Sequence, residues 1–541
     1  MLRLNSASLP VLEQMESRML LDGLPGPDLV AVMNSTVIPS TVVPGEGGTI
    51  RVQVTNQGDE TAVSLPGTRV TGRIYFSADT SLDQNTDVLL GEYSAAMNLR
   101  AGASATVNIR VDVPTDTATG QYHLILQLDT DGLLTVPESN IVNNVVATDD
   151  SKEVAWKFGS FAGRTNVLLT LAGAAAGSEV TFRMAGAGYG SVVETVADVP
   201  AGRVGYDVTV RNSLTSSSVT VTAAATAGVV LGSVDVDQAS LKSFVARGLA
   251  LVGDLTVDGT LASLTVGDVG TYLGDDVSID IGSTLGTRAT FTAALGRVAN
   301  VQMDCDIPIK ALTMVDWRDS AGVEGATAGD AADRLDAPSI GTLKVNGRTG
   351  LRGNFSPDVN LTGAATAKNL KSALITGDVI DADWRIRGVV GTFGVWGSFT
   401  DSSFRTTGSI SKVILGAAVR SDFLAGIDAQ AVRHATTDDD FSPAVIIGTF
   451  KVTGWRVASG QVPPRFFVDS NVSAAKVRAT FLANMEIDNG GTDFGLFVMD
   501  IPGLGEVKSV ASSDTHSGWS WTWKPRIEDS FALQDFVVSI L

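Results

Sequence analysis

Three copies of one short phrase decide the fold of this chain: Ser339-Ile-Gly-Thr-Leu-Lys-Val-Asn-Gly347, Val389-Val-Gly-Thr-Phe-Gly-Val-Trp-Gly397 and Ile446-Ile-Gly-Thr-Phe-Lys-Val-Thr-Gly454. In each copy a glycine follows an aliphatic residue, apolar and polar residues then alternate, and a second glycine ends the phrase. Alternation with a period of two between glycines is typical of a strand that lies between two tight corners. A strand that recurs in this way predicts a β-solenoid, in which successive coils of the chain stack on one another.

The stacking of coils predicts which side chains face the interior. Alternate side chains of a strand point to opposite faces, so the apolar positions of one copy are expected to lie over those of another. Glycine, asparagine and aspartate are expected at the corners, because those positions visit positive φ. Since aromatic residues make up only 6% of the chain, we expect an interior built from Val, Ile, Leu, Ala and Thr. The equivalent inward positions are Ile340, Leu343 and Val345 in the first copy and Val390, Phe393 and Val395 in the second.

The composition argues against several classes of partner and site. The chain has 541 residues, with 59 acidic against 39 basic side chains and a net charge of −20. An acidic excess repels phosphate backbones, so nucleic acid is not expected as a partner. The single cysteine, Cys305, excludes an internal disulfide and a thiolate-rich metal site, and we expect it to be buried. No run approaches the ~18 uninterrupted apolar residues of a membrane-spanning helix, so no transmembrane segment is expected.

Residues 27–152 differ in character from the repeats. Runs of alternating apolar and polar residues, such as Thr49–Val54, Ala105–Val111 and Gly120–Leu128, are separated by Pro, Gly and Asp. Short strands at this spacing are typical of an immunoglobulin-like sandwich of ~100 residues.

Several phrases of the same region carry a family resemblance. They are Pro27-Asp-Leu-Val30, Val52-Gln-Val-Thr-Asn-Gln-Gly58, the segment from Tyr75 to Gly91, and the stretch from Asp129 that ends in Glu138-Ser-Asn-Ile-Val-Asn-Asn144. Together they resemble the CARDB family, a bacterial adhesion-related domain. The resemblance covers the whole sandwich and implies an immunoglobulin-like fold with a role at a cell surface.

The N-terminal segment, residues 1–26, contains the run Met15-Glu-Ser-Arg-Met-Leu-Leu21. This run resembles the LEPR-xLL signature found at the start of many bacterial surface proteins. Its Glu, Arg and final two Leu match the signature, whereas Met15 stands in place of Leu and Ser17 in place of Pro. The resemblance implies export to the cell surface or beyond; a short amphipathic helix is the alternative interpretation.

One loop of the sandwich has the composition of a cation site. Asp83, Asn85 and Asp87 form the pattern D-x-N-x-D, with which a tight turn can direct three oxygen donors at Ca²⁺. An EF-hand loop would also need Gly at its sixth position and an acid at its twelfth, where this chain has Val88 and Ser94. Asp and Asn are equally favoured in metal-free turns, because their side chains bond to nearby backbone groups. Both interpretations, calcium site and Asx-rich turn, stay open at this point.

Three tryptophans near the C-terminus, Trp519, Trp521 and Trp523, alternate with small polar residues. On a strand, their indoles would lie on one face. A flat aromatic face can stack on sugar rings, so these residues are the candidate carbohydrate contact. Aromatic residues at the end of a solenoid can instead cover its last coil, and residues 511–541 are predicted to form a C-terminal cap.

The dipeptide Trp-Arg also recurs, at Trp317-Arg318, Trp384-Arg385 and Trp455-Arg456. Guanidinium groups that stack on indoles would form a ligand-binding line along one side of the solenoid. Alternatively, the dipeptides mark repeated corners without a ligand.

The sequence thus predicts an all-β protein in which an immunoglobulin-like β-sandwich precedes a parallel β-helix or solenoid. Residues 1–26 are the export segment and residues 27–152 the sandwich. Residues 153–228 are a β-rich connector or the first coils. The solenoid spans residues 229–510, and residues 511–541 cap it. Its Gly-rich texture is similar to that of large bacterial surface proteins.

The predicted function is non-enzymatic: a secreted or cell-surface protein in adhesion or envelope structure. Other surface proteins or extracellular polysaccharide are the expected partners. No G-x-S-x-G, H-E-x-x-H, P-loop or dinucleotide-binding motif is present. The alternative is a β-helix protein that binds or degrades polysaccharide as a lyase or hydrolase, which would require a groove with clustered carboxylates, arginines and exposed aromatic residues. The oligomeric state is left open.

Overall fold

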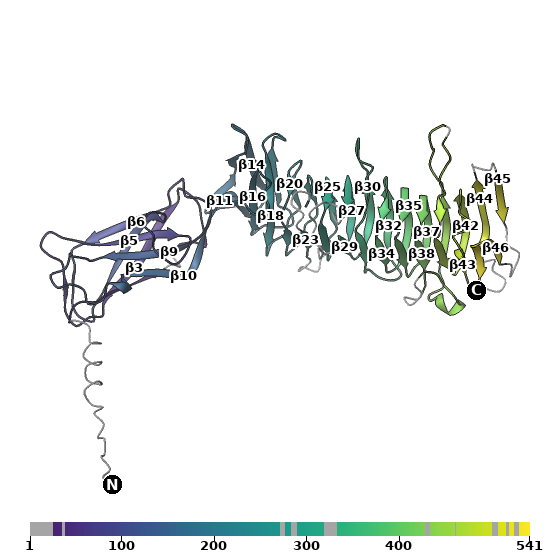
Figure 1. Cartoon of the computed structure of the whole chain (residues 1–541). Helices are drawn as coiled ribbons and strands as arrows, with labels where there is room; N and C mark the ends of the chain where they lie inside the picture. Colours follow the sequence, from purple (N-terminus) through teal and green to yellow (C-terminus); the bar gives the residue numbers. More distant parts are fainter. Residues whose placement is uncertain are drawn as a thin grey trace, which may run out of the picture. The chain divides into compact units, whose positions relative to one another are not determined.

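The three repeated phrases are strands of one sheet in the computed structural model of the chain (Figure 1). They form β30 (Ile340–Val345), β35 (Val389–Thr400) and β39 (Ile446–Val452). These strands run parallel: β32 (Lys368–Ile375) pairs with both β30 and β35, and β37 (Ile410–Val419) pairs with both β35 and β39. The pairing aligns the aliphatic residue that precedes the first glycine of each copy in one column of buried side chains. The prediction that these positions stack is therefore confirmed. The column consists of Ile340, Leu370, Val390, Ile410 and Ile447.

The structure describes residues 25–34, 38–270, 276–282, 289–318, 333–427, 433–459, 461–499, 507–514, 519–523 and 530–541. The run that resembles the LEPR-xLL signature lies outside these residues. The chain divides into two units, Met1–Lys157 and Phe158–Leu541. Within the described ranges all regular structure is strand, apart from the 3₁₀ turns η2 (Val142–Asn144) and η3 (Asp438–Asp440). None of these ranges contains a helix of the length and apolarity that a bilayer crossing requires.

The first unit is a sandwich of two sheets. Its strands are β1 (Leu29–Asn34), β2 (Thr41–Val42), β3 (Gly47–Asn56), β4 (Ala62–Val63), β5 (Val70–Ser77), β6 (Val88–Ala95), β7 (Asn98–Leu99), β8 (Ser104–Asp112), β9 (Gly120–Asp129) and β10 (Val145–Val154). One sheet has the order β1-β3-β8 and the other β2-β10-β9-β5-β6, while β4 and β7 form a separate pair. Inward residues such as Ile50, Ile74 and Leu126 form a single core, as the predicted immunoglobulin-like sandwich requires.

Two polar residues of the phrases that resemble CARDB stabilise this sandwich. The Asn56 side chain is buried; its Nδ2 donates to the carbonyl of Leu99 at 2.9 Å, and its Oδ1 accepts from the backbone N of Asp28 at 3.1 Å. The Glu138 carboxylate accepts from Thr130 Oγ1 at 2.5 Å. Because a buried polar group is costly unless it is bonded, these residues favour one arrangement of the loops.

The second unit consists mainly of two long sheets, of 18 and 17 strands, and the chain passes repeatedly from one to the other. The first long sheet contains β11 (Trp156–Phe161), β12 (Arg164–Val167), β15 (Tyr189–Thr195), β16 (Val204–Arg211), β18 (Val229–Asp237), β20 (Ala250–Leu251), β21 (Leu255–Val257), β23 (Val277–Ile281), β26 (Val301–Cys305), β29 (Arg334–Ala337), β31 (Asp358–Leu361), β34 (Asp383–Ile386), β36 (Ser403–Thr406), β38 (Asp422–Ala425), β41 (Asn471–Ala474), β43 (Phe494–Val498), β46 (Phe531–Leu533) and β47 (Phe536–Ile540).

The second long sheet contains β30, β35 and β39 together with β13 (Leu169–Ala172), β14 (Glu179–Ala185), β17 (Ser218–Ala223), β19 (Ser243–Ala246), β22 (Leu264–Val266), β24 (Phe291–Ala294), β27 (Ile309–Met314), β32 (Lys368–Ile375), β33 (Val379–Ile380), β37 (Ile410–Val419), β40 (Phe467–Val468), β42 (Lys476–Ala483), β44 (Val507–Asp514) and β45 (Trp519–Trp523). Two short strands, β25 (Arg297–Ala299) and β28 (Asp316–Arg318), form a separate pair.

Pairing in the long sheets is parallel in the middle and antiparallel at both ends. Parallel pairs run from β16 to β47 in the first long sheet and from β17 to β44 in the second. Antiparallel pairs precede them, such as β13 with β14 and β15 with β16, and follow them, as β44 with β45 and β46 with β47. The last parallel strands are thus covered by strands of the same chain.

A column of aromatic rings runs through the interior of the second unit from β28 to β47. Neighbouring ring centroids lie 4.5–6.3 Å apart. Aliphatic residues such as Leu370, Val390 and Ile410 are buried as expected, but the expectation missed this aromatic column. The aromatic residues are few, but parallel register places them next to one another, where ring pairs stabilise the core beyond the area they bury. The column contains Trp317, Phe355, Trp384, Phe393, Phe404, Phe423, Phe450, Phe467, Phe494 and Phe536.

One set of corners follows the expected chemistry. Asp381, Asp401 and Asp469 have φ values of 51°, 49° and 36°, so aspartate adopts the left-handed conformation two residues before each of the strands β34, β36 and β41. Arg420 occupies the same position before β38, which pairs with β36 and β41, and has φ of 47°. Its guanidinium forms an ion pair with the Asp401 carboxylate at 2.5 Å.

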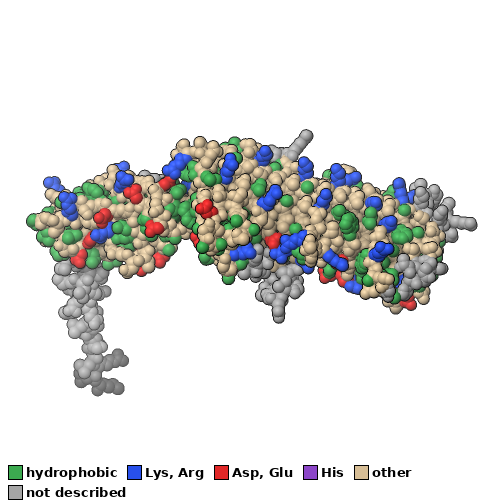
Figure 2. Space-filling model, turned by 90° about the horizontal axis from the view of Figure 1, so that it is seen from above, with side chains coloured by type: hydrophobic (Ala, Val, Ile, Leu, Met, Phe, Trp, Pro, Cys, Tyr) green, Lys and Arg blue, Asp and Glu red, His purple; other side chains and the backbone are tan. Residues whose placement is uncertain are grey.

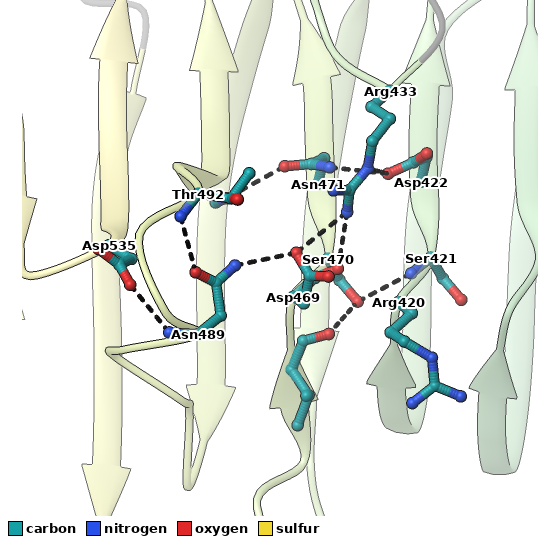
Figure 3. A network of polar contacts seen from close by, with 12 residues as sticks. Arg420, Ser421, Asp422, Arg433, Asp469, Ser470, Asn471, Asn489, Thr492 and Asp535 are labelled. Atoms are coloured by element: carbon teal, nitrogen blue, oxygen red, sulfur yellow. Dashed lines mark hydrogen bonds and ion pairs between the residues drawn. The ribbon is translucent and has the colours of Figure 1, made fainter.

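Beside this corner runs a ladder of buried serines. The backbone N of Ala382 donates to Ser402 Oγ at 3.0 Å, Ser402 N donates to Ser421 Oγ at 3.2 Å, and Ser421 N donates to Ser470 Oγ at 3.1 Å. Figure 3 shows the last of these bonds. Each hydroxyl thus satisfies the backbone N–H of the preceding position in this ladder.

Candidate ligand-binding groove

A groove lies on the outer face of the first long sheet, over β29, β31, β34 and β36. Because alternate side chains of a strand share a face, each of these strands places two polar side chains here. Parallel pairing aligns them into two lanes that cross the strands. One lane consists of Arg334, Asp358, Asp383 and Ser403, and the other of Asp336, Asn360, Arg385 and Arg405.

Two neighbouring cavities form the groove, of about 220 and 440 Å³. Asn360 and Arg385 line both of them, which makes the groove continuous. Carboxylates predominate in the smaller cavity and guanidinium groups in the larger. The smaller cavity is lined by Asp336, Asp358 and Asp383, and the larger by Arg387 and Arg405.

Ion pairs organise the acidic end of the groove. Arg334 lies 2.6 Å from the Asp304 carboxylate and 3.4 Å from the Asp336 carboxylate. Asn360 Nδ2 donates to Asp336 Oδ1 at 2.8 Å. The hydrogen bond to Asp304 raises the pKa of Arg334, which keeps this guanidinium charged.

Asp358 and Asp383 are the central carboxylates. Asp358 Oδ1 accepts a hydrogen bond from the backbone N of Asp383 at 2.7 Å. Ser403 Oγ donates to Asp383 Oδ1 at 2.5 Å, and Arg385 lies 3.5 Å from the Asp383 carboxylate. Burial raises the pKa of Asp358, although the bond from Asp383 N acts in the opposite direction. A carboxyl group with a raised pKa in a concave site is a candidate for ligand contact.

The groove ends at β38, where residues 433–441 cover both lanes. Leu424 of β38 packs beneath this segment, in a cluster with Ala435 and Phe441. Arg433 attaches this segment to the sheet through ion pairs: its guanidinium lies 3.1 Å from Asp469 Oδ1 and 3.9 Å from Asp422 Oδ1 (Figure 3). This network closes one end of the groove.

Of the groove residues, only Arg385 was singled out in the sequence, as part of the dipeptide Trp384-Arg385. A signal was present in the polar-apolar-polar triplets Arg334-Leu-Asp336, Asp358-Val-Asn360, Asp383-Trp-Arg385 and Ser403-Phe-Arg405. Each triplet is short and common in strands, so it gains meaning only when pairing places the triplets side by side.

The predicted calcium residues lie in the first unit, between β5 and β6, and bond to one another. Asp83 Oδ1 accepts from the backbone N of Asn85 at 2.9 Å, and Asp87 Oδ2 accepts from the backbone N of Asp83 at 2.8 Å. The bond from Asn85 lowers the pKa of Asp83. No three His, Cys, Asp or Glu side chains converge as metal ligands anywhere in the described ranges. These bonds match the Asx-rich turn, and the calcium site stays a prediction.

We expect chelation of calcium to leave the melting midpoint of the first unit unchanged. Hydrogen bonds within the loop already hold Asp83, Asn85 and Asp87 in a turn, so the fold does not need a cation here. Calorimetry of the full chain with EGTA, and again with excess Ca²⁺, measures this. A melting midpoint that rises with Ca²⁺ in the unmodified chain, but not in the Asp83→Asn variant, would instead support the calcium site.

The tryptophans of β45 lie at the end of the second long sheet. The ring centroids of Trp521 and Trp523 are each 5.5 Å from that of Phe531, on the outermost strand of the first long sheet. The Trp519 side chain falls outside the described part of the chain. Both described indoles are half-buried, in positions that match a cap between the sheet ends. Carbohydrate contact by Trp519, Trp521 and Trp523 stays a prediction.

The repeated Trp-Arg dipeptides do not form one line of stacked pairs. Trp317 and Trp384 are completely buried in the aromatic column, and Arg385 lies on the opposite face of its strand, in the groove. Trp455, in contrast, is 45% exposed and contacts the Phe466 ring at 4.7 Å. The recurrence therefore reflects strand alternation in two of the copies.

Comparison with known proteins concerns the first unit. The CARDB domain of the PF1109 protein from Pyrococcus furiosus, solved in complex with di-metal ions, is 20% identical over 24% of this chain and 88% of that chain, with a TM-score of 0.17. A solution structure of the same domain is 21% identical over 24% of this chain and 97% of that chain, with a TM-score of 0.18. A β-glucosidase from Listeria innocua is 15% identical over 24% of this chain and 16% of that chain, with a TM-score of 0.15.

No curated protein matches the chain. The CARDB family model matches residues 26–148, which cover the two-sheet sandwich except for the end of β10. The same region carries the phrases that resembled CARDB in the sequence. Residues 26–148 of this chain are therefore a CARDB domain.

Proposed function

We propose that this chain is a non-enzymatic, secreted or cell-surface protein that binds extracellular polysaccharide and acts in adhesion or envelope structure. The CARDB domain supports this role, because the family is linked to surface and adhesion functions. The polysaccharide lies in the groove of the second unit, and other surface proteins are further partners. The net charge of −20 disfavours nucleic acid as a ligand of the whole chain.

The second unit is, in this proposal, a parallel β-solenoid. Support comes from the chain's regular passage between two long sheets and from the parallel register of both. Columns such as Ile340, Leu370 and Val390 require each coil to lie directly over the previous one. A solenoid of this kind presents a long, rigid surface to a partner.

The two lanes of the groove are the observation that carries the proposal. Neighbouring strands lie about 4.8 Å apart, so each lane offers a polar group at that interval. This interval is similar to the length of one sugar residue in an extended chain. Asn360 and Arg385, which line both cavities, can therefore contact consecutive sugars. An extended peptide, with about 3.3 Å per residue, fits the interval less well.

A glycan array tests the proposal with the full chain and the groove variants Asn360→Ala and Arg385→Gln. We expect specific glycans to bind, and each variant to weaken their apparent affinity about tenfold, as the loss of a hydrogen bond to a charged group predicts. Arg247→Gln is the matched control, because Arg247 is exposed in the same unit and does not line the groove. An array without any specific binding would contradict the proposal.

Polysaccharide cleavage is the second candidate, since Asp358 combines a raised pKa with a neighbouring carboxylate on Asp383. The ion pairs of the groove support binding without cleavage, because the charged groups already have partners. Asp383 pairs with Arg385, and Arg334 pairs with Asp304 and Asp336. The same full chain, incubated with each bound glycan, is expected to release no new reducing ends. Release that stops in Asp358→Asn would establish cleavage.

A further inference from the structure

The outer face of the second long sheet is basic, although the chain as a whole is acidic. From β27 to β42 the strands of this sheet contain no aspartate or glutamate. Figure 2 shows Lys and Arg side chains spread over the second unit with few acidic ones between them. The exposed basic residues of these strands form what we call the lysine face: Lys310, Lys344, Lys368, Lys371, Lys412, Lys451 and Arg478.

The charges of the lysine face are not neutralised within the described part of the chain. The ammonium groups of Lys310, Lys344, Lys371 and Lys412 form no ion pair with any described residue, whereas Arg334 in the groove has two acidic partners. Lys451 lies over the Phe481 ring, 5.4 Å from its centroid. Like charges on neighbouring strands repel one another and lower stability. An anion bound across these strands removes that cost.

The middle of the lysine face is flat and carries an exposed indole. Its strand β35 has glycine at Gly391 and Gly394, and Trp396 beyond them is 63% exposed. On either side, β32 carries Lys371 and β37 carries Lys412, and both strands pair with β35. Lys371 lies beside Gly391 and Lys412 beside Thr392, about 13–16 Å along β35 from Trp396. A sugar chain that runs along this strand can therefore stack one ring on Trp396 while anionic groups two or three sugars away meet the two lysines.

We propose that the lysine face binds an anionic polysaccharide, whose sugar rings carry carboxylate, sulfate or phosphate groups. Lys371 and Lys412 lie on the two strands that flank β35, so a sugar chain that runs along β35 meets a cation on each side. Duplex DNA also presents anions, about 1.7 Å apart along its axis, but its stacked bases offer no free ring face to Trp396. This site consists of other residues than the groove and does not depend on it.

Binding of the full chain to polygalacturonate, a neutral β-galactan and duplex DNA tests the inference. We expect polygalacturonate to bind, and the double variant Lys371→Gln/Lys412→Gln to weaken it at least tenfold and to reduce its salt dependence. The control double variant Lys242→Gln/Arg247→Gln removes the same charge from exposed positions elsewhere in the unit and is expected to change the affinity less than twofold.

The variant Trp396→Ala separates a sugar-binding site from a merely cationic surface. We expect it to weaken polygalacturonate several-fold and to leave any DNA binding unchanged. Equal affinity for galactan and polygalacturonate, or equal losses in the two double variants, would overturn the inference while the groove proposal stands. Tighter binding of DNA than of polygalacturonate, unaffected by Trp396→Ala, would overturn it in favour of nucleic acid. If Asn360→Ala and Arg385→Gln alone abolish polygalacturonate binding, the groove is the site and this inference fails.

Discussion

Replacing Phe393 with alanine is expected to destabilise the second unit by about 3–5 kcal/mol, the usual cost of deleting a large aromatic side chain from a core. The ring is completely buried, and its centroid lies 4.9 Å from that of Trp384 and 4.5 Å from that of Phe404. Strands in fixed register hold these neighbours, so they cannot close the cavity that the variant leaves. Urea unfolding of the full chain, followed by tryptophan fluorescence, measures the loss because Trp384 contacts the ring.

Trp396→Ala is the matched control for this prediction. Trp396 belongs to the same strand as Phe393 but is 63% exposed, so its removal is expected to change the free energy of unfolding by less than about 0.5 kcal/mol. Similar unfolding midpoints for the two variants would show that the aromatic column is not closely packed at Phe393.

Replacing Gly391 with alanine is expected to cost about 2 kcal/mol, a typical penalty for overpacking. A Cβ atom on Gly391 would overlap the carbonyl oxygen of Lys371 on the neighbouring strand. The glycines at the same place in the other two copies, Gly341 and Gly448, each have a carbonyl oxygen 2.5 Å from the position of a Cβ atom. The first glycine of the repeated phrase is thus required by the close approach of the preceding coil, and only a shift of the backbone would admit a side chain.

Gly394→Ala provides the control in the same strand. Its added methyl group would meet Leu374 Cδ1 at 3.4 Å, an ordinary contact, so we expect no loss of stability and a small gain from the stiffer backbone. Hydrogen exchange measures the protection of the backbone amides of β32, β35 and β37 in the two variants, which are the strands next to the substituted positions. Equal protection in both would contradict the steric explanation for Gly391.

Some features of the fold could be predicted from the sequence because they depend on local rules. The inward column through Ile340 and Val390 follows from alternation along a strand, and aspartate at Asp401 follows from its tolerance of positive φ. The CARDB phrases predicted the sandwich because residues such as Asn56 and Glu138 form bonds that its loops need. Burial of Cys305, where burial raises the thiol pKa, was also expected.

Other features could not be predicted in the same way. The low aromatic content pointed to an aliphatic interior, yet register collects the rings of Trp384, Phe393 and Phe404 into one column. The period of two at Trp521 and Trp523 did not decide between a cap and a sugar platform. Their contact with Phe531 depends on where β46 packs relative to β45, which is a tertiary contact. Composition and spacing do not contain that information.

The sequence by itself determined which side chains of each repeated phrase point inward, since a strand's alternation is a property of neighbouring residues. Only the tertiary structure decided which strands lie side by side, because the segments between aligned positions differ in length: Val390 to Ile410 is far shorter than Ile410 to Ile447. Pairing across these unequal segments brings Arg385 next to Arg405 in the groove and gathers exposed lysines on the opposite sheet. The candidate binding surfaces therefore follow from the register between coils, which no single repeat specifies.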